Sequence, residues 1–289
     1  MIEHIDFTPQ IVNGVEQARR LFHGRGHSYP GFEHVSIDWL PPVALITLYK
    51  EQSYDWLMPI AEQLLDNLPN CQTVMVQYRC RPRAPFERLI GGTVATLQVE
   101  VQGLKFQLQF GQAQNIGLFL DMSNGWQWLR EHAEGKRVLN LFAYTCAFSV
   151  AAIEGGAEQV VNMDLSKASL SRGRDNHRLN GHDTSKVIFQ GLDIFKSFSR
   201  IKKFGPYDIL VCDPPLFQKG SIDLRRDYQK IIRRLPEFMK PGSLLMLCLN
   251  APELGDEFLL EMVASECPAC EYLMHIAPPE VCVEVEPGK

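Results

Sequence analysis

The stretch KRVLNLFAYTCAFSVAAIEGGAEQVVNMD, residues 136–164, has the pattern of a strand, a tight turn, a helix and a second strand. Residues 138–142 form an apolar run that is too short for a buried helix and typical of a buried parallel strand. Residues 147–154 resume an apolar pattern, which a pair of glycines ends. A second apolar run, 159–163, is closed by Asp164. We predict a right-handed βαβ unit with a carboxylate at the tip of its second strand.

The alternation of strand and helix continues through the rest of the chain. Further strands are predicted at 186–190, 207–212, 243–249 and 272–277, and helices at 166–179, 194–202, 224–239 and 255–265. Short apolar runs separated by amphipathic helices indicate a parallel sheet with helices on both faces. The fold class is therefore α/β, with a doubly wound, Rossmann-like sheet.

The sequence before this sheet predicts a smaller α/β module and a hairpin. The module is expected to contain a helix at 8–22, a loop at 23–34, a strand at 43–49, a helix at 54–68 and a strand at 73–78. A basic, Pro/Gly-broken linker is expected at 79–92. Residues 94–101 and 104–110 alternate strictly around Gln102-Gly103, which predicts a β-hairpin. The expected domains are 1–90, the module; 91–118, the hairpin extension; and 119–289, the main domain, which a helix at 121–133 enters.

Composition excludes several classes of protein. The chain has 289 residues, 45% of them hydrophobic, and a formal net charge of −5. Its apolar runs are shorter than the ~20 residues of a membrane span, and its N-terminus lacks the pattern of a signal peptide. We therefore expect a cytoplasmic protein whose eight cysteines are reduced thiols. The negative charge argues against a DNA-coating protein but leaves room for a local basic patch.

Polar residues stand where the predicted strands end. In doubly wound sheets, ligands lie beyond the carboxyl ends of the strands. The residues at those positions are Tyr144, Thr145, Cys146 and Ala147 after the first strand, then Asp164, Asp193, Asp213 and Asn250 after the next four. The first turn lacks GxGxxG, which argues against NAD or FAD because a pyrophosphate needs close backbone approach. A nucleoside ligand without phosphates is the better expectation.

Three segments carry a family resemblance. Residues 138–181, residues 99–129 with their GLFLD sequence, and YDILVCDPPLF at 207–217 together resemble class I S-adenosylmethionine-dependent methyltransferases. The order of these segments is most similar to that of the Rlm-type enzymes, which methylate large-subunit (23S) ribosomal RNA. The resemblance implies S-adenosyl-L-methionine as cofactor, and RNA, either 23S rRNA or a ribosome assembly intermediate, as partner.

The resemblance also implies roles for individual residues. Tyr144, Thr145 and Ala147 would line the methionine end of the cofactor, Asp164 with Leu165 would bind the ribose, Asp193 with Ile194 would hold the adenine, and Phe119 and Asp121 would close the site. Asp213, Pro214, Pro215 and Phe217 would face the methyl group and the substrate base, with Phe217 stacking on it. Methyl transfer chiefly requires that the nucleophile be positioned for in-line attack, and a base in folded RNA must first be flipped out.

Two departures from the family pattern leave an alternative open. The family turn YTGGF has Cys146 at its first glycine, and the arginine of FLDxR is replaced by Ser123. These changes motivate a second hypothesis, a catalytically weakened, methyltransferase-fold protein that binds RNA or the ribosome. Cys248 is the only thiol after the fifth strand, where relatives that methylate a cytosine carbon carry a catalytic cysteine. We expect Cys248 to be structural, and transfer to a base nitrogen rather than covalent carbon methylation.

The remaining motifs are weaker. Cys267 and Cys270 form a single CxxC without a second pair of ligands, and no metal site is expected. Four arginines close to aromatic residues form the expected RNA-contacting patch. They are Arg79, Arg81, Arg83 and Arg88; Tyr78 precedes them and Phe86 lies between the last two.

Overall fold

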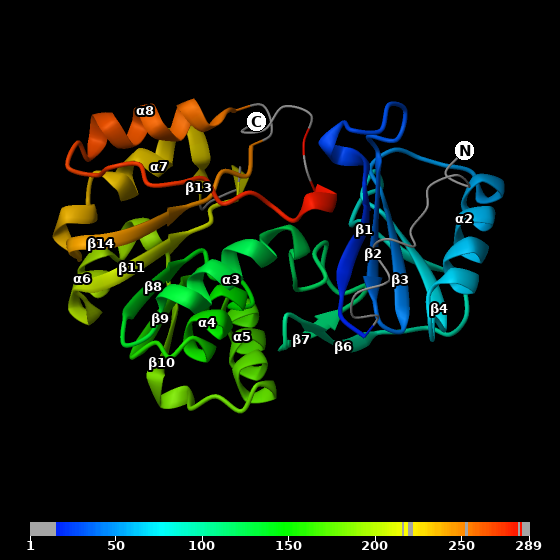
Figure 1. Cartoon of the computed structure of the whole chain (residues 1–289), viewed down its shortest axis with the longest axis horizontal. Coiled ribbons are helices and arrows are strands. Elements are labelled where there is room, and N and C mark those ends of the chain that lie inside the picture. The colour runs from blue at the N-terminus through cyan, green and yellow to red at the C-terminus, as the bar shows by residue number, and fades with distance from the viewer. Residues whose placement is uncertain (1–15, 216, 219–221, 252–253, 283, 285–289) are drawn as a thin grey trace. The chain divides into compact units, whose positions relative to one another are not determined.

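The computed structural model describes residues 16–215, 217–218, 222–251, 254–282 and 284, and divides into two compact units (Figure 1). The first unit runs to Ser123 and includes a segment that begins at Ala277; the second runs from Asn124 to Ile276. Among the described residues, no helix is long and apolar enough to cross a membrane.

The first unit is built on a five-stranded sheet. Its strands, in spatial order, are β1 (Arg19–His23), β2 (Val35–Leu40), β3 (Val43–Leu48), β4 (Thr73–Tyr78) and β5 (Phe86–Ile90). Only β3 and β4 pair in parallel, and helix α2 (Tyr54–Asn67) connects them. As its spacing predicts, α2 buries Leu57, Ile60 and Leu64 against the sheet. The predicted strands at 43–49 and 73–78 and the helix at 54–68 are confirmed.

Two predictions for this unit are wrong. Residues 19–23 are strand β1 rather than the end of a helix at 8–22; the residues before 16 lie outside the described part of the chain. The pairing register with β2 shifts between Arg20 and Phe22, so the consecutive residues Leu21 and Phe22 are both buried. Two consecutive buried residues break the alternation of a regular strand and fit the pattern of a helix. Residues 86–90 are strand β5, which pairs with β4 at the edge of the sheet, and not part of a linker. The charged residues Glu87 and Arg88 are exposed on this strand, so its sequence lacks the apolar pattern of a buried strand.

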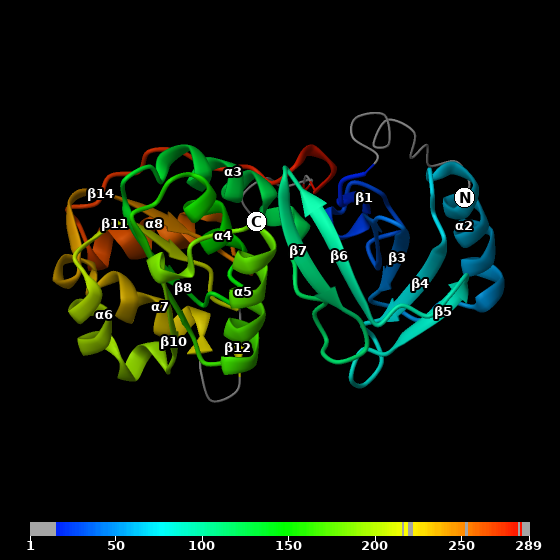
Figure 2. The same cartoon turned by 90° about the horizontal axis from the view of Figure 1, so that it is seen from below.

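The predicted hairpin is present as β6 (Thr96–Val101) and β7 (Leu104–Gln109), which pair antiparallel (Figure 2). Gln102 and Gly103 have φ of 51° and 81°, so both residues of the turn are left-handed. That is the conformation that matches the twist of a two-residue hairpin.

The second unit is the doubly wound sheet. Its strands, in spatial order, are β10 (Val187–Gly191), β9 (Gln159–Asp164), β8 (Arg137–Leu141), β11 (Tyr207–Cys212) and β14 (Met239–Leu247), all parallel. Its helices are α3 (Ser123–His132), α4 (Ala147–Glu154), α5 (Lys167–Leu179), α6 (Phe198–Phe204), α7 (Leu224–Ile232) and α8 (Asp256–Glu266). Helices α6, α7 and α8 pack on one face, against Leu139, Leu141 and Leu210, and α4 and α5 lie on the other (Figure 1). The predicted α/β class is confirmed.

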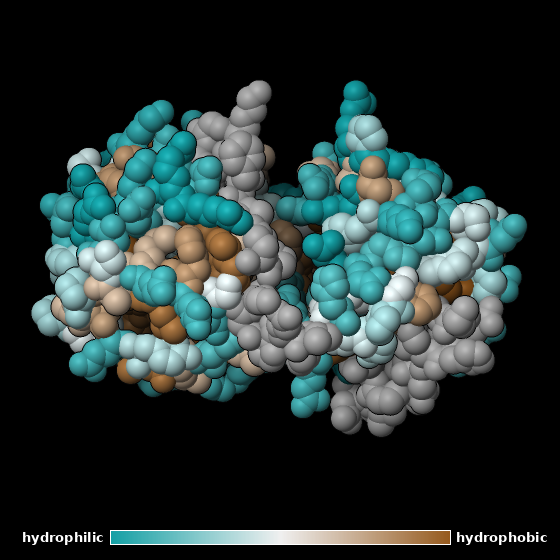
Figure 3. Space-filling view, turned by 90° about the horizontal axis from the view of Figure 1, so that it is seen from above, coloured by the Kyte–Doolittle hydropathy of each residue, from teal (hydrophilic) through white to brown (hydrophobic). Residues whose placement is uncertain are grey.

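One predicted strand of this sheet is absent. Residues 272–277 do not form a strand, and β14 is the last strand of the sheet among the described residues. Tyr272, Leu273 and Met274 are more than half exposed, at 63%, 70% and 56%. Their apolar side chains are therefore not part of a buried strand. Figure 3 shows that apolar residues, in brown, reach the surface of the second unit.

A line of buried polar side chains crosses the α4/α5 side of the sheet. Nδ2 of Asn140 donates to Asn162, whose Nδ2 donates to Oγ of Ser149, each at 2.9 Å. Oγ of Ser149 lies 2.9 Å from Nε2 of His177, and Nδ1 of His177 lies 3.0 Å from Nδ1 of His182. Ser149 accepts from Asn162, and the tautomer of His177 sets the direction of the hydrogen bond between Ser149 and His177. Burial, with His182 adding to it, lowers the pKa of His177 from 6.5 to about 3, so its ring is neutral.

This line of side chains predicts acid sensitivity. Below pH 6.5 the unfolded chain gains a proton on His177 that the folded chain does not take up until about pH 3, so stability falls as the pH falls through that window. Urea unfolding should therefore show wild type losing about 2 kcal/mol more than His177→Gln between pH 7 and pH 5. His132→Gln, at an exposed position at the end of α3, should retain the wild-type pH dependence. Equal slopes for wild type and His177→Gln would contradict this assignment.

Candidate functional site

The register of the second unit brings five strand ends to one edge. Gln190, Met163, Leu141, Cys212 and Leu247 lie side by side in the pairing of neighbouring strands. The residues that follow each of them therefore begin the loops at the same edge, as the parallel sheet predicts. Most of the residues predicted for the site lie in these loops.

Asp164 joins the first two loops. Its Oδ2 accepts from the backbone N–H of Tyr144 at 2.8 Å, and its Oδ1 accepts from that of Ser166 at 2.7 Å. Burial raises the pKa of this carboxyl, and the two backbone N–H donors oppose that shift without cancelling it. Each oxygen keeps a second lone pair. The carboxylate is thus oriented by two loops and can still accept two hydrogen bonds, a match to the vicinal hydroxyls of a ribose.

The turn after β8 has an unusual backbone. Phe142, Tyr144 and Cys146 all have positive φ, of 58°, 46° and 64°, although none is a glycine. Thr145, between two of them, is buried, and its carbonyl accepts from Nδ2 of Asn176 on α5 at 3.0 Å. Ala147 begins α4. The turn therefore presents the N-terminus of a helix, where backbone N–H groups favour an anionic group such as a carboxylate.

Asp193 and Ile194 form the third loop. Asp193 caps a short 3-10 helix, η5 (Ile194–Lys196), by accepting from the N–H of Phe195 at 2.9 Å, and Nζ of Lys196 lies 3.4 Å from its other oxygen. Ile194 is buried in the core. Leu165, after β9, is 45% exposed, which leaves an apolar side chain free to cover a ligand.

The fourth and fifth loops meet through Asn250, which the sequence placed at a strand end but did not single out. Its Nδ2 donates to Oδ1 of Asp213 at 2.7 Å and to the carbonyl of Pro214 at 3.0 Å. The reverse amide orientation would point an oxygen at two acceptors, so this one follows from the partners. Beneath them, the buried Tyr228 hydroxyl donates to the carbonyls of Cys212 and Cys248, at 3.0 and 3.3 Å. The only signal for Asn250 was an amide directly after an apolar run.

Two further predicted residues continue the fourth loop. Pro215 is half-buried and follows Pro214 directly. Phe217 belongs to strand β12 (Phe217–Gln218), which pairs with β13 (Ile222–Asp223). The side chain of Phe217 lies outside the described part of the chain, so its stacking role stays a prediction.

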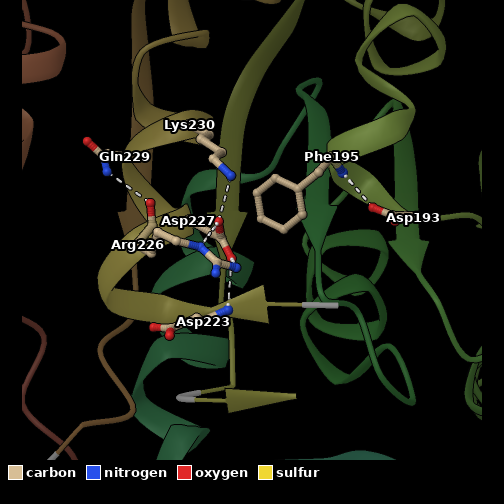
Figure 4. A network of polar contacts seen from close by, with 7 residues as sticks. All are labelled: Asp193, Phe195, Asp223, Arg226, Asp227, Gln229 and Lys230. Carbon is tan, nitrogen blue, oxygen red and sulfur yellow. Dashed lines mark hydrogen bonds and ion pairs between the residues drawn. The ribbon is translucent and has the colours of Figure 1, made fainter. Parts of the chain in front are cut away.

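A charged network holds the end of the loop that leaves Asp213 (Figure 4). The buried Asp227 carboxylate accepts from the N–H of Asp223 at 2.9 Å, from Arg226 at 2.7 and 3.0 Å and from Lys230 at 2.7 Å. These partners, the Arg226 hydrogen bond above all, hold the pKa of Asp227 well below its usual range. Nζ of Lys230 lies 5.9 Å from the ring centre of Phe195, so the network also reaches η5.

Phe119 and Asp121 belong to the first unit. Phe119 is 43% exposed. Burial lowers the pKa of the neighbouring Arg20 guanidinium, but the charges of Asp38 and, more weakly, Cys282 and Asp121 outweigh burial and raise it overall. Asp121 therefore lies near a buried Arg20–Asp38 ion pair. Its predicted part in closing the site stays a prediction.

The arginines expected to contact RNA are partly engaged by the protein. Arg81 forms ion pairs with Glu51 and Glu87 and lies 3.5 Å over the Tyr78 ring. Arg79 donates to Oδ1 of Asn115 at 2.7 Å. The charge of Arg81 is thus largely compensated, a feature that the sequence spacing does not reveal.

The described residues contain no group of three or more His, Cys, Asp or Glu side chains arranged to hold a metal ion. The sulfurs of Cys267 and Cys270 lie 3.2 Å apart at the end of α8.

Comparisons with known proteins address the family and the fold of the chain. A family model described as S-adenosylmethionine-dependent methyltransferase matches residues 19–289. A ribosomal RNA large subunit methyltransferase I from Aeromonas hydrophila is 37% identical over 168 residues, which are 57% of this chain and 42% of that protein. The protein of the same name from Shewanella denitrificans is 27% identical over 257 residues, 86% of this chain and 64% of its own. The chain thus spans less than two thirds of the length of these relatives.

Solved structures give the same result. A putative methyltransferase complexed with S-adenosylhomocysteine (SAH) superposes with a TM-score of 0.85 at 25% identity, over 96% of this chain and 74% of that one. A putative SAM-dependent methyltransferase from Streptococcus mutans gives a TM-score of 0.84 at 25% identity, over 96% and 73%.

The Asp227 network generates a stability prediction. Asp227→Asn removes the negative charge that accepts hydrogen bonds from Arg226, Lys230 and the backbone N–H of Asp223. The variant should lower the free energy of unfolding by about 1–3 kcal/mol. Urea unfolding at pH 7 measures this loss. The matched control is Asp175→Asn on α5, whose pair with Arg178 is exposed and should contribute less than about 0.5 kcal/mol. Equal losses for the two variants would show that Asp227 is not a structural anchor.

Proposed function

This chain belongs to the S-adenosylmethionine-dependent methyltransferases, and we propose that it transfers a methyl group to a base of RNA, namely large-subunit rRNA. The observation that carries the proposal is the Asp164 carboxylate, oriented by Tyr144 and Ser166 at the edge of the sheet where doubly wound folds bind their ligands. The names of the rRNA methyltransferase I relatives support the RNA class.

The residues present fit S-adenosyl-L-methionine, which when bound supplies the transferable methyl on its sulfonium. Asp164 would accept hydrogen bonds from both ribose hydroxyls, with Leu165 beside the sugar. Asp193 would accept from the adenine amino group against Ile194. Tyr144, Thr145 and Ala147 would hold the amino-acid end at the start of α4, where N–H groups suit a carboxylate. The roles of Phe119 and Asp121 stay predictions, because both residues belong to the other compact unit.

Asp213 and Pro214 are proposed to position the substrate base. Both oxygens face one amide nitrogen, Nδ2 of Asn250, which resembles an amino or ring N–H of a base in its donor chemistry. A base that donates to the same oxygens would place its nitrogen for in-line attack. Pro215 would restrict the backbone next to Pro214, because its ring fixes φ, and Phe217 would stack on a flipped-out base. This favours transfer to nitrogen over covalent chemistry at Cys248.

The partner that we propose is 23S rRNA or a ribosome assembly intermediate, which would place the reaction in the cytoplasm. The alternative, a weakened methyltransferase-fold protein that only binds RNA, was motivated by Cys146 and Ser123. Cys146 is accommodated without disturbing the hydrogen bonds of its turn, since its N–H donates to Ala143 at 2.7 Å and its carbonyl accepts from Val150 at 2.9 Å. This observation favours the enzyme.

Cofactor binding is the first test. Calorimetric titration of the wild type with SAH should give micromolar affinity, about −8 kcal/mol. Asp164→Ala should weaken binding at least about 100-fold, because two hydrogen bonds to a charged acceptor are lost. Asp175→Ala, at a surface position on α5, should bind like the wild type.

Absence of binding by the wild type at millimolar SAH would overturn the cofactor assignment. Tight RNA binding under the same conditions would then favour the alternative of a non-catalytic RNA-binding protein.

Methyl transfer is the second test. With large-subunit rRNA and isotopically labelled cofactor, Asp213→Ala should reduce transfer by at least about 100-fold while the circular dichroism spectrum stays unchanged. Glu261→Ala, exposed on α8, should transfer like the wild type. Cys248→Ala separates the two chemistries, since transfer to nitrogen should survive it and covalent catalysis should not. Preserved transfer in Asp213→Ala would remove this residue from the proposed site.

A further inference from the structure

A glycine stands in the middle of α5, at a position where glycine weakens a helix. Gly173 is buried, and an alanine Cβ at that position would lie 2.3 Å from Sγ and 2.8 Å from Cβ of Cys146. Real contacts do not reach such distances, and Cys146 is fully buried. The side chain of Cys146 therefore occupies the space that a side chain at position 173 would need.

Cys146 itself stands where glycine would be expected. Its φ of 64° is left-handed, and it is the residue directly before α4. Left-handed backbone is costly for a residue with a Cβ, so tertiary contacts must hold Cys146 in this conformation. Cys146 packs in a cluster with Ala143, Leu170 and Phe189. Burial raises the pKa of its thiol well above the usual range, in keeping with a packing side chain.

The same face of α5 holds the preceding residue of the turn. Asn176, three positions after Gly173, donates to the carbonyl of Thr145 at 3.0 Å. Tyr144, one residue earlier, is held by Asp164 at 2.8 Å. Three consecutive residues of the turn are thus each held from another element, two of them by α5.

We infer that Cys146 and Gly173 form a matched pair that sets the conformation of the cofactor-binding turn, with Gly173 acting as a positioning residue on α5. The turn has Cys146 where the family has a glycine, and the glycine on the neighbouring helix, Gly173, leaves room for the Cys146 side chain. The inference rests on the proposed cofactor role of Tyr144, Thr145 and Ala147. It adds that the contact between Cys146 and Gly173 on α5, outside the loop, determines the geometry of the turn.

A double-mutant cycle tests the pair, with SAH affinity and the midpoint of thermal unfolding as readouts. Gly173→Ala alone should weaken SAH binding at least about tenfold and lower the midpoint, since the new Cβ displaces Cys146. In a Cys146→Gly background the same change meets only the Thr145 carbonyl carbon, at 3.3 Å. There it should alter affinity less than about threefold and leave the midpoint unchanged or raised, because alanine favours the helix.

Ser171→Ala is the matched control, because it also raises helix propensity on α5 but at an exposed position; it should not change SAH affinity. If Gly173→Ala fails to fold, recovery of folding in the double variant supports the pair, and failure of the double variant overturns it. Equal effects of Gly173→Ala in both backgrounds, or a lowered midpoint with unchanged affinity, would also overturn the positioning role. A wild type that does not bind SAH would instead refute the cofactor proposal, and the positioning role with it.

Discussion

The hydrogen bonds to the Asp164 carboxylate are the interaction on which the site depends. One oxygen accepts the N–H of Tyr144 and the other that of Ser166, so one side chain ties the turn after β8 to the tip of β9. Burial raises the pKa of this carboxyl, which reflects the cost of holding it away from water. Its two remaining lone pairs give the ribose of a nucleoside cofactor its proposed binding site.

Helix α5 supports the same turn from below. Gly173 makes room for Cys146, Asn176 binds Thr145, and His177 continues the line of buried side chains that reaches the strands through Ser149. Polar groups buried in this way are favourable only when every partner is present. The turn and the helix therefore stabilise each other, and this contact is the basis of the proposal that α5 positions the cofactor-binding turn.

The other half of the site is organised by two side chains that approach from different directions. The Asn250 amide holds Asp213 and Pro214 together, and Asp227 anchors the segment where their loop returns to α7. A loop proposed to position a base gains accuracy when both of its ends are held by rigid elements. The DPP sequence therefore accounts for only part of the geometry at this position.

Much of this protein could be predicted from the sequence alone. The βαβ pattern of residues 136–164 determined the class of the second unit, since short apolar runs between helices bury well only in a parallel sheet. Because all parallel strands end at one edge, the positions of Asp164, Asp193 and Asp213 followed from chain order. The hairpin followed from strict alternation around Gln102-Gly103, and α2 from its buried face.

Only the tertiary structure decided the remaining features, because each depends on a partner far along the chain. Leu21 and Phe22 imitate a helix until pairing with β2 produces a bulge. Residues 86–90 resemble a linker until β4 supplies their hydrogen bonds, and 272–277 resemble a strand although no pairing forms. Cys146 stands out as a departure in the sequence, and only its contact with Gly173, 27 residues later, explains how it fits. Local pattern determines what a segment can form, whereas long-range contacts determine which of those possibilities is stable.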